Sequence, residues 1–391
     1  MGEWKKYILE DVIDKFIDYR GKTPKKTTFG IPLVTAKIVK SGRILEPNEF
    51  IAKDAYDSWM TRGLPEIDDV VLTTEAPLGE VALIKDKNVA LAQRIITLRG
   101  NKNFVHNPFL KYYFQSASGQ YELESRASGT TVFGIKAAVL KIISVILPSL
   151  PEQKAIASVL SSLDDKIDLL HRQNKTLEAM AETLFRQWFV EEAQADWKDK
   201  CLGDIADINP IYPLKKGENS TYLEMRNVSS STFNPDGWYT REFTSGMKFQ
   251  NGDTLLARIT PCLENGKTCF VTFLDQGETG WGSTEYIVLR MKKPFHPYIS
   301  YIIAKDKDFR DYAISSMSGS SGRQRAQANV IKEYDIKIPA LDIIEALNRQ
   351  LAEIIPKLEN NANQIRTLEK LRDTLLPKLM NGEARVEYSK N

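Results

Sequence analysis

The sequence predicts two similar mixed α/β (α+β) domains in tandem, separated by two long helices that pack as an antiparallel coiled coil. Three observations support this fold class. A helical block from the middle of the chain returns at its end, each block has a heptad pattern, and strand-like runs recur in the same order. We divide the 391 residues into a first domain (1–150), a first spacer helix (151–193), a second domain (194–340), and a second spacer helix with a tail (341–391).

The repeated block reads KTLEAMAETLFRQWF at 175–189 and RTLEKLRDTLLPKLM at 366–380. Five of the fifteen positions are identical at a constant offset of 191, where ordinary composition gives roughly one. The stretches beginning at Trp4 and Trp197 are also alike, so the repeat extends to the domains. We therefore expect two similar binding sites, which suit a target with two halves.

In the first domain, apolar runs at 69–73, 81–84 and 95–98 predict strands, and Pro108 begins a helical stretch. The second domain repeats this order, with predicted strands at 253–257, 269–273 and 287–289 and a helix after Pro297. A polar loop follows in each domain, and then a strand that ends before Pro148 or Pro339.

The two helical blocks carry mostly apolar residues at alternating steps of three and four, which we call the seam positions. In the first block these are Ile156, Leu160, Leu163, Ile167, Leu170, Asn174, Leu177, Ala181, Leu184 and Trp188. In the second block they are Leu347, Leu351, Ile354, Leu358, Asn361, Ile365, Leu368, Arg372, Leu375 and Leu379. Such a sustained heptad seam indicates a coiled coil. The alternative, two amphipathic helices that each lie on their own domain, would not need so narrow a seam.

Each seam contains one asparagine. If the helices pair antiparallel so that partner residue numbers sum to 535, Asn174 faces Asn361 and Leu177 faces Leu358. A shift by one heptad would leave each amide facing hydrocarbon, at a cost of roughly 1–3 kcal/mol. The asparagines therefore select the register. Pro356 makes the register before it less secure, since proline removes a helical hydrogen bond.

Composition excludes several classes of protein. The chain is 42% hydrophobic and 27% charged, contains no apolar run of the ~20 residues that span a bilayer, and begins without a signal-peptide core. Its three cysteines form no CxxC and its three histidines are scattered, so we expect no disulfide framework, no metal site and no cofactor. We expect a cytoplasmic protein. The net charge of +2 does not by itself indicate a nucleic-acid partner.

No catalytic constellation emerges. Residues 263–268 (LENGKT) resemble the end of a phosphate-binding loop, but Pro261 occupies the place of its leading glycine. The Asn-Pro at 209–210 is better explained as a turn than as part of a methyltransferase motif. Carboxylates that suggest a nuclease are better explained as solvated strand ends; these are Asp68, Asp69, Glu75 and Glu80.

Polar loops offer candidate DNA contacts instead. Arginine reads guanine edges, glutamine and asparagine read adenine edges, and hydroxyl groups bind phosphates. In the second domain the candidates are Arg226, Asn227, Arg258, Arg323, Gln324, Arg325 and Gln327. In the first domain they are Lys37, Lys40, Arg43, Thr74, Arg94, Thr130 and Thr131. Each of these stretches is individually weak, because a solvated loop or a strand edge has a similar composition.

The chain resembles the specificity subunit of type I restriction-modification systems. LPEQKAIASVLSSLDDKIDLL with KTLEAMAETLFRQWF, and NQIRTLEKLRDTLLPKLMNGEARV, are similar to the family's two spacer regions. DVVLTTEAPLGEVALI and DTLLARITPCLENGKTCFV are similar to its paired target recognition domains. The resemblance implies a non-catalytic subunit that binds double-stranded DNA and recruits two methyltransferase and two restriction subunits. The second spacer departs from the pattern at its start, LDIIEALNRQ.

Two other functions stay open: a coiled-coil scaffold with two protein-binding domains, and a DNA methyltransferase with an unrecognised site.

If the chain is the DNA-recognition subunit that the resemblance implies, the helix length predicts the geometry of its DNA target. The 32 steps from Ile156 to Trp188 span about 48 Å at ~1.5 Å per residue, or roughly 14 base pairs of DNA. Because the loops of the two domains differ, we expect a non-palindromic target with two unlike half-sites and an unread middle.

Overall fold

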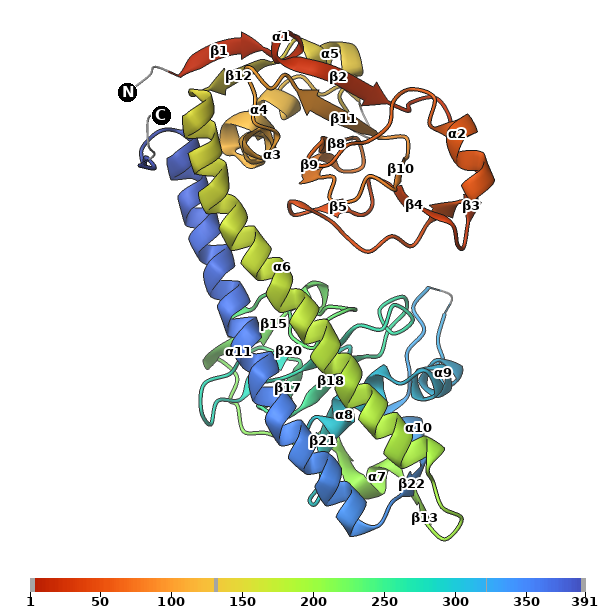
Figure 1. Ribbon diagram of the computed structural model, residues 1–391. Coiled ribbons are helices and arrows are strands. Elements are labelled where there is room, and N and C mark those ends of the chain that lie inside the picture. Colours follow the sequence, from red (N-terminus) through yellow and green to blue (C-terminus); the bar gives the residue numbers. More distant parts are fainter. Residues whose placement is uncertain (1–3, 130–132, 321, 388–391) are drawn as a thin grey trace. The chain divides into compact units, whose positions relative to one another are not determined.

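The central strands of the first globular part are buried on both faces, which explains their continuous apolar sequences. In the computed structural model, β2 (Ile13–Asp18), β11 (Ile95–Gly100), β8 (Val70–Thr74) and β9 (Leu78–Leu83) form an antiparallel sheet in that order (Figure 1). Successive side chains of a strand point to opposite faces. Val70 and Leu72 therefore enter one hydrophobic core, while Val71 enters another.

A helical layer covers one face of this sheet and a smaller sheet covers the other. The helical layer contains α3 (Asn107–Gln115), whose Phe109 is buried, and α4 (Ala117–Glu124). The smaller sheet has the order β10-β4-β7-β3, with β10 at Ala90–Leu91, β4 at Ile31–Val34, β7 at Phe50–Ile51 and β3 at Lys26–Thr27. The first globular part is thus a three-layer mixed α/β domain.

The second globular part has the same architecture. Its central sheet has the order β14-β21-β18-β19, formed by Ala206–Ile208, Tyr286–Met291, Thr254–Ala257 and Thr268–Phe270. The smaller sheet has the order β16-β15-β20-β17, formed by Tyr239–Glu242, Asn219–Leu223, Gly280–Gly282 and Met247–Phe249. The helices α8 (Ile299–Lys305) and α9 (Lys307–Ser315) follow. The predicted repetition of a mixed α/β fold is therefore confirmed.

A two-stranded ribbon joins the beginning of each globular part to its end. β1 (Lys5–Ile8) pairs with β12 (Ser144–Leu147), and β13 (Lys198–Cys201) pairs with β22 (Asp335–Ile338). In both ribbons the second strand ends directly before the expected proline. The remaining elements are short: α1 (Leu9–Val12), β5 (Val39–Lys40), β6 (Arg43–Ile44), η1 (Lys53–Ala55), α2 (Tyr56–Trp59), α5 (Ala137–Lys141), η2 (Gln187–Glu191), α7 (Leu202–Ile205), η3 (Met225–Asn227) and α10 (Ala328–Lys332).

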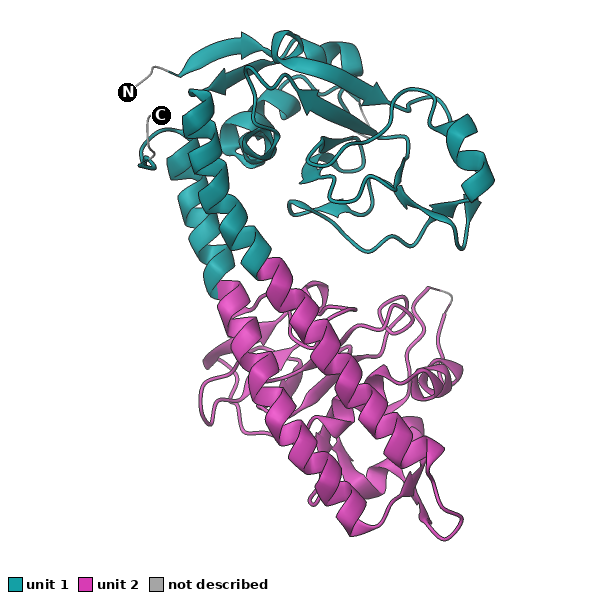
Figure 2. Cartoon of the chain, in the orientation of Figure 1, with its two compact units in different colours: residues 1–166, 367–391 teal, residues 167–366 magenta. Residues whose placement is uncertain are grey.

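Two long helices, α6 (Leu150–Arg186) and α11 (Leu341–Met380), run through both compact units of the chain (Figure 2). One unit comprises 1–166 with 367–391, and the other comprises 167–366. Each unit therefore contains one globular part together with a stretch of both helices. The structure describes residues 4–129, 133–320 and 322–387. The prediction that the two helices pack against each other is confirmed.

The seam asparagines meet inside the second unit. The Nδ2 of Asn361 donates a hydrogen bond to the Oδ1 of Asn174 over 2.9 Å, and both residues are buried. Leu177 and Leu358, the next pair whose numbers sum to 535, belong to one hydrophobic core. The helix α11 is continuous through Pro356.

The antiparallel pairing also holds within the first unit. There the Nη1 of Arg372 donates to the Oδ1 of Asp164 over 3.2 Å, and these residue numbers sum to 536. Arg372, the one charged residue of the predicted seam, is therefore neutralised across the helix pair by an acidic residue next to the seam.

The buried face of the helices is wider than the heptad seam. Glu178, Phe185 and Phe189 of the α6 region and Ile355 and Ala362 of α11 are buried outside the seam positions. The apolar residues among them join the core of the second globular part. The seam is one part of a wider buried face, because each helix packs on a domain as well as on the other helix. The two long helices therefore have two interfaces, one with each other and one with the core of the second globular part.

We expect the asparagine pair to be energetically coupled. Asn174→Leu leaves the buried amide of Asn361 facing hydrocarbon, and should lower the free energy of unfolding by about 1–3 kcal/mol. The double variant N174L/N361L should recover most of this loss, because two leucines restore an apolar seam. Thermal unfolding of the wild type, both single variants and the double variant measures the coupling. Additive single effects would show that the amides act independently.

Candidate nucleic-acid interface

Three loops meet at one end of the central sheet of the first unit. The N–H of Thr74, at the end of β8, donates to the carbonyl oxygen of Arg94, just before β11, over 2.9 Å. The N–H of Ile135 donates to the carbonyl oxygen of Thr74 over 3.0 Å. Ser128 and Gly134 exchange two backbone hydrogen bonds, and Gly134 also bridges to Glu75. We call this group of residues, Thr74, Glu75, Arg94, Ser128 and Gly134, the first junction.

The same backbone arrangement recurs in the second unit. The N–H of Arg258 donates to the carbonyl oxygen of Glu285 over 2.9 Å, and the N–H of Ala326 donates to the carbonyl oxygen of Arg258 over 2.8 Å. Ser318 and Arg325 exchange two backbone hydrogen bonds, and Arg325 bridges to Ile259. This second junction consists of Arg258, Ile259, Glu285, Ser318 and Arg325. The repeated fold therefore brings three loops together twice.

Each junction carries one arginine–carboxylate pair, but on different loops. In the first junction, the Nε of Arg94 lies 3.0 Å from the Oε1 of Glu75. In the second, the Nε of Arg325 donates to both carboxylate oxygens of Glu285 over 2.9 Å, and its Nη2 donates to the Oε1 over 2.7 Å. Sequence reasoning proposed both arginines and missed both glutamates as partners. An alignment of the two repeats places Arg94 of the first repeat opposite Glu285 of the second, and these two residues have opposite charges.

The other candidates of the first unit are distributed over two regions. Lys40 and Arg43 are opposite each other in the strand register of the β5–β6 hairpin. The Nζ of Lys37 lies 3.9 Å from a carboxylate oxygen of Glu49. Thr74 is only 1% exposed, so it supports the junction through its backbone rather than presenting its hydroxyl group. Thr130 and Thr131 lie outside the described residues.

In the second unit, the hairpin after α9 contributes most candidates. Arg323 and Gln324 are exposed, and the Nε2 of Gln327 donates to the Oγ of Ser318 over 2.8 Å and to the carbonyl oxygen of Arg325 over 3.0 Å. The Nε of Arg258 is buried and has no hydrogen-bond partner among the described residues. Arg258 and Arg325 thus belong to the second junction, and Arg323, Gln324 and Gln327 lie on the hairpin that carries Arg325.

The turn η3 carries the two remaining candidates, and a lysine ties it to the central sheet. The Nζ of Lys267 donates to the carbonyl oxygens of Met225 and Arg226 over 2.9 and 3.2 Å, while its own carbonyl oxygen accepts from Ala257 at the end of β18. Arg226 is exposed and forms an ion pair with Glu224. The Nδ2 of Asn227 donates to the carbonyl oxygen of Gly237 over 2.9 Å, so this amide holds a loop in place.

One interpretation of the strand-end carboxylates is corrected by the structure. Asp69 is 1% exposed and is therefore not solvated; its two oxygens accept from the Nε and Nη2 of Arg99 over 2.9 and 2.7 Å. Its counterpart Asp253 is fully buried and accepts from the Nε of Arg290 over 2.6 Å and from the hydroxyl group of Tyr212 over 3.0 Å. A charge buried this deeply requires such partners. These carboxylates brace the central sheets.

A second class of residues missed by sequence reasoning anchors α6 to each globular part. In the first unit, the Oδ2 of Asp164 accepts from the Nζ of Lys111 over 2.6 Å and from the hydroxyl group of Tyr112 over 2.7 Å. In the second unit, Tyr301 donates its hydroxyl group to the Oε2 of Glu178 over 3.1 Å. Tyr112 and Tyr301 occupy matching places after Pro108 and Pro297. Each tyrosine thus holds an acid of the same helix.

The two acids differ in their electrostatics. Burial disfavours ionisation of Asp164, but the adjacent Lys111 ammonium outweighs this effect, and the pKa of Asp164 is lowered. Burial raises the pKa of Glu178 to about 7, although the hydroxyl of Tyr301 and the N–H of Phe233 favour its charged form. The nearby Glu182 also has a raised pKa because of burial, and the pKa of Lys305 is lowered by burial.

We expect Glu178 to make stability depend on pH. Its folded-state pKa is raised, so its contribution to stability is complete in acid and is lost as pH rises through about 7. Glu178→Gln removes the charge and keeps groups that accept from Phe233 and bond Tyr301. The variant should match the wild type near pH 4, below the ordinary glutamate pKa of 4.5, and exceed its free energy of unfolding by up to about 3 kcal/mol at pH 8. Thermal unfolding across this range is the measurement, and a constant difference between the two proteins would contradict the assignment.

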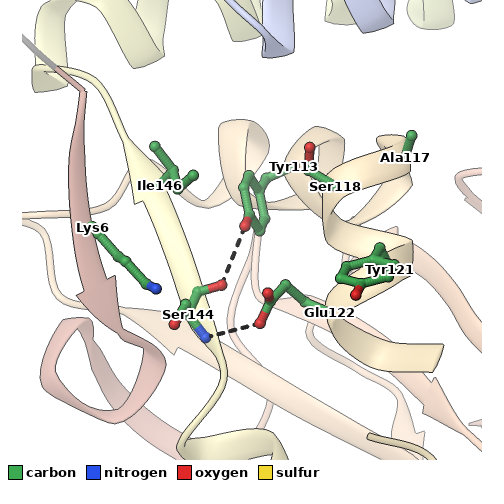
Figure 3. A pocket seen from close by; sticks show the side chains of 8 residues that line it. All are labelled: Lys6, Tyr113, Ala117, Ser118, Tyr121, Glu122, Ser144 and Ile146. Atoms are coloured by element: carbon green, nitrogen blue, oxygen red, sulfur yellow. Dashed lines mark hydrogen bonds between the residues drawn. The ribbon is translucent and has the colours of Figure 1, made fainter. Parts of the chain in front are cut away.

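The clearest concavity of the first unit lies away from the candidate DNA contacts. It has a volume of about 430 Å³, and Figure 3 shows its lining: Lys6, Tyr113, Ala117, Ser118, Tyr121, Glu122, Ser144 and Ile146. Tyr113 donates its hydroxyl group to the carbonyl oxygen of Ser144 over 3.2 Å, and the N–H of Ser144 donates to the carboxylate of Glu122 over 3.2 Å. These contacts join the β1–β12 ribbon to the helices.

Among the residues that the structure describes, no three or more His, Cys, Asp or Glu side chains gather as metal ligands would. Likewise, within the ranges that the structure describes, every helix is too short or too polar to cross a membrane.

Comparisons with known proteins agree with this architecture. The family model of the type I restriction modification DNA specificity domain matches residues 1–179 and again 194–372. The type I restriction enzyme MjaIX specificity subunit of Methanocaldococcus jannaschii is 26% identical over 350 residues, covering 81% of this chain and 78% of that protein. The HindI specificity subunit of Haemophilus influenzae is 21% identical over 474 residues, covering 98% and 100%.

Among solved structures, the chain is similar to the S subunit of a type I restriction-modification system from M. genitalium. The TM-score is 0.55 and the identity is 16%, over 99% of this chain and 97% of that one, which shows a shared fold. The family model matches both repeats of the chain, and each repeat contains one junction. The chain therefore belongs to the type I restriction-modification DNA specificity family, as a non-catalytic subunit that determines the DNA target of the enzyme complex.

Proposed function

We propose that the chain recognises a bipartite, non-palindromic sequence in double-stranded DNA, with one half-site bound at each junction. The observation that carries this proposal is the recurrence of one three-loop backbone arrangement with different exposed side chains: Arg94 and Glu75 in one unit, and Arg325, Arg323 and Gln324 in the other. Similar frames with unlike surfaces suit two unlike half-sites. Arginine and amide side chains supply the hydrogen bonds that base edges require.

Methylation of random duplexes tests this proposal directly. The full chain, combined with its methyltransferase subunit, should methylate only duplexes that share two short motifs at a fixed separation. Methylation without a common motif would contradict sequence recognition. A gel shift with and without the methyltransferase subunit distinguishes the alternative of a scaffold with two protein-binding domains, which predicts no DNA-dependent shift in either case.

We further propose that the assembly contains two methyltransferase subunits and two restriction subunits, and works in the cytoplasm where chromosomal DNA lies. The outward faces of the long helices are the surface that we assign to the methyltransferase subunits. Leu169 and Met180 of α6 are 40% and 50% exposed, and they lie eleven residues apart, about three helical turns, on one face. A concavity of about 520 Å³ beside them is lined by Leu169, Arg172, Gln173, Thr176, Leu177, Lys357 and Asn361.

Charge placed on this face should prevent assembly. We expect the double variant L169E/M180E to fold normally, because both side chains are exposed, but to lose co-purification with the methyltransferase subunit. Deletion of the C-terminal residues would be a poorer test, since Leu379 and Met380 are buried in the core of the first unit. The matched control I211E alters an apolar residue of the second globular part, outside both long helices, that is 98% exposed. Assembly of L169E/M180E at the wild-type level would place the partner elsewhere.

A further inference from the structure

The arginine–carboxylate pairs of the two junctions have a geometry that leaves part of each guanidinium group open. A guanidinium group has a side edge, formed by Nε and one Nη, and an end, formed by the two Nη atoms. The carboxylate of Glu285 occupies the side edge of Arg325 through Nε and Nη2. Glu75 lies against the Nε of Arg94 in the same sense. In each pair the carboxylate is therefore on the side edge.

Both arginines are accessible at the position where they are held. The side chain of Arg94 is 54% exposed and that of Arg325 is 41% exposed. The Nη1 of Arg325 makes one further hydrogen bond, to the carbonyl oxygen of Arg323 over 3.2 Å, which fixes the plane of the group. Because each Nη carries two hydrogens, the end of the Arg325 fork retains donors for a ligand. A planar pair of donors fits two acceptors side by side.

The backbone of Arg94 supports a role beyond surface charge. Its φ angle is +70°, a left-handed conformation that costs a residue with a Cβ energy and that glycine adopts freely. Strained residues of this kind persist where the surrounding structure fixes them, and they are common at binding sites. The position of Arg325 in the second repeat is matched by Gly134 in the first repeat, since each exchanges two backbone hydrogen bonds with a serine, Ser318 or Ser128. The side chains at these positions are therefore not required by the backbone frame.

We propose that Arg94 and Arg325 each read one guanine, in different half-sites, and that Glu75 and Glu285 are positioning residues that hold each guanidinium side-on with its end toward the base. The proposal rests on the proposed function of the junctions. In the major groove, guanine presents O6 and N7 as adjacent acceptors, which match the end of the fork, whereas adenine presents an acceptor beside a donor. The carboxylate also limits the rotation of a long side chain, so less conformational freedom is lost on binding.

Glycine substitutions test this assignment with little risk to folding. Arg94→Gly relieves the left-handed backbone, and Arg325→Gly reproduces the residue of the other repeat. Each variant of the full chain, combined with its methyltransferase subunit, is used to methylate a random duplex library that is then sequenced. We expect R94G to lose discrimination at one G·C pair of one half-site, by about 5- to 150-fold, and R325G to do so in the other half-site. All other positions should be unchanged.

Further variants separate reading from general charge effects. In E75Q/R94G and E285Q/R325G the isolated carboxylate is also removed, so the loss at the same base pair must persist without added repulsion of phosphates. Lys85→Ala and Lys307→Ala remove exposed lysines that pair with Asp68 and Asp311, and should leave the motif intact. An unchanged motif in R94G and R325G, with uniformly slower methylation, would overturn the proposal. A wild-type complex without any bipartite motif would instead overturn the proposed function.

Discussion

Replacing Asp164 by alanine should lower the free energy of unfolding of the first unit by about 3–5 kcal/mol, the cost typical of removing one partner from a buried ion pair. Asp164 faces two cations and a phenol: Lys111, which is 4% exposed, Arg372 of α11, and Tyr112. The variant removes a carboxylate that links α3, α6 and α11. Thermal unfolding at pH 7 measures the loss.

The pH dependence of this loss follows from the lowered pKa of Asp164. Its contribution to stability is present above the ordinary aspartate pKa and is lost as pH falls through the lower folded-state value. The difference between D164A and the wild type should therefore be constant at neutral pH and shrink only in acid. Asp165→Ala is the matched control, because Asp165 is the next residue of the same helix and its side chain is exposed. An equal effect of both substitutions would show that helix propensity, and not the ion network, causes the loss.

Lengthening both long helices by one heptad should change the target itself. We propose that the helices set the distance between the half-sites. Duplicating 160–166 directly after Lys166, and 369–375 directly after Leu368, inserts stretches that face each other in the register with partner numbers summing to 535. One heptad adds ~10 Å at ~1.5 Å per residue, which corresponds to about three base pairs. The unread gap should lengthen by that amount, while both half-site motifs remain.

The twist of DNA makes a second insertion informative. Three base pairs turn the groove by roughly a quarter to a third of a turn, so the one-heptad variant should methylate more slowly than the wild type. Insertion of three heptads adds ~31 Å, close to one full turn of ~34 Å, and should restore much of the rate with a gap about nine pairs longer. Methylation of the original gap by either variant would show that the helices do not determine the spacing.

The sequence by itself determined the features that depend on neighbours along the chain. The heptad steps identified the long helices, and the single asparagine of each seam gave the partners Asn174 and Asn361, because an unpaired buried amide excludes the shifted registers. The apolar runs at 69–73 and 253–257 identified the central strands, because strands buried on both faces need no polar alternation. The repeat itself predicted that the two globular parts share one fold.

The tertiary structure alone decided which side chains meet across strands and loops. The sequence predicts that Asp69 is a solvated strand end, yet the side chain is buried against Arg99, thirty residues away in the sequence. The ion pairs Glu75–Arg94 and Glu285–Arg325 join different loops in the two repeats, so no periodic pattern in the sequence predicts them. The partners of a helix face within a heptad lie at fixed offsets in the chain. Those of a loop side chain depend on how separate strands come together, and the junctions exist only because the folded sheets bring three distant loops to one place.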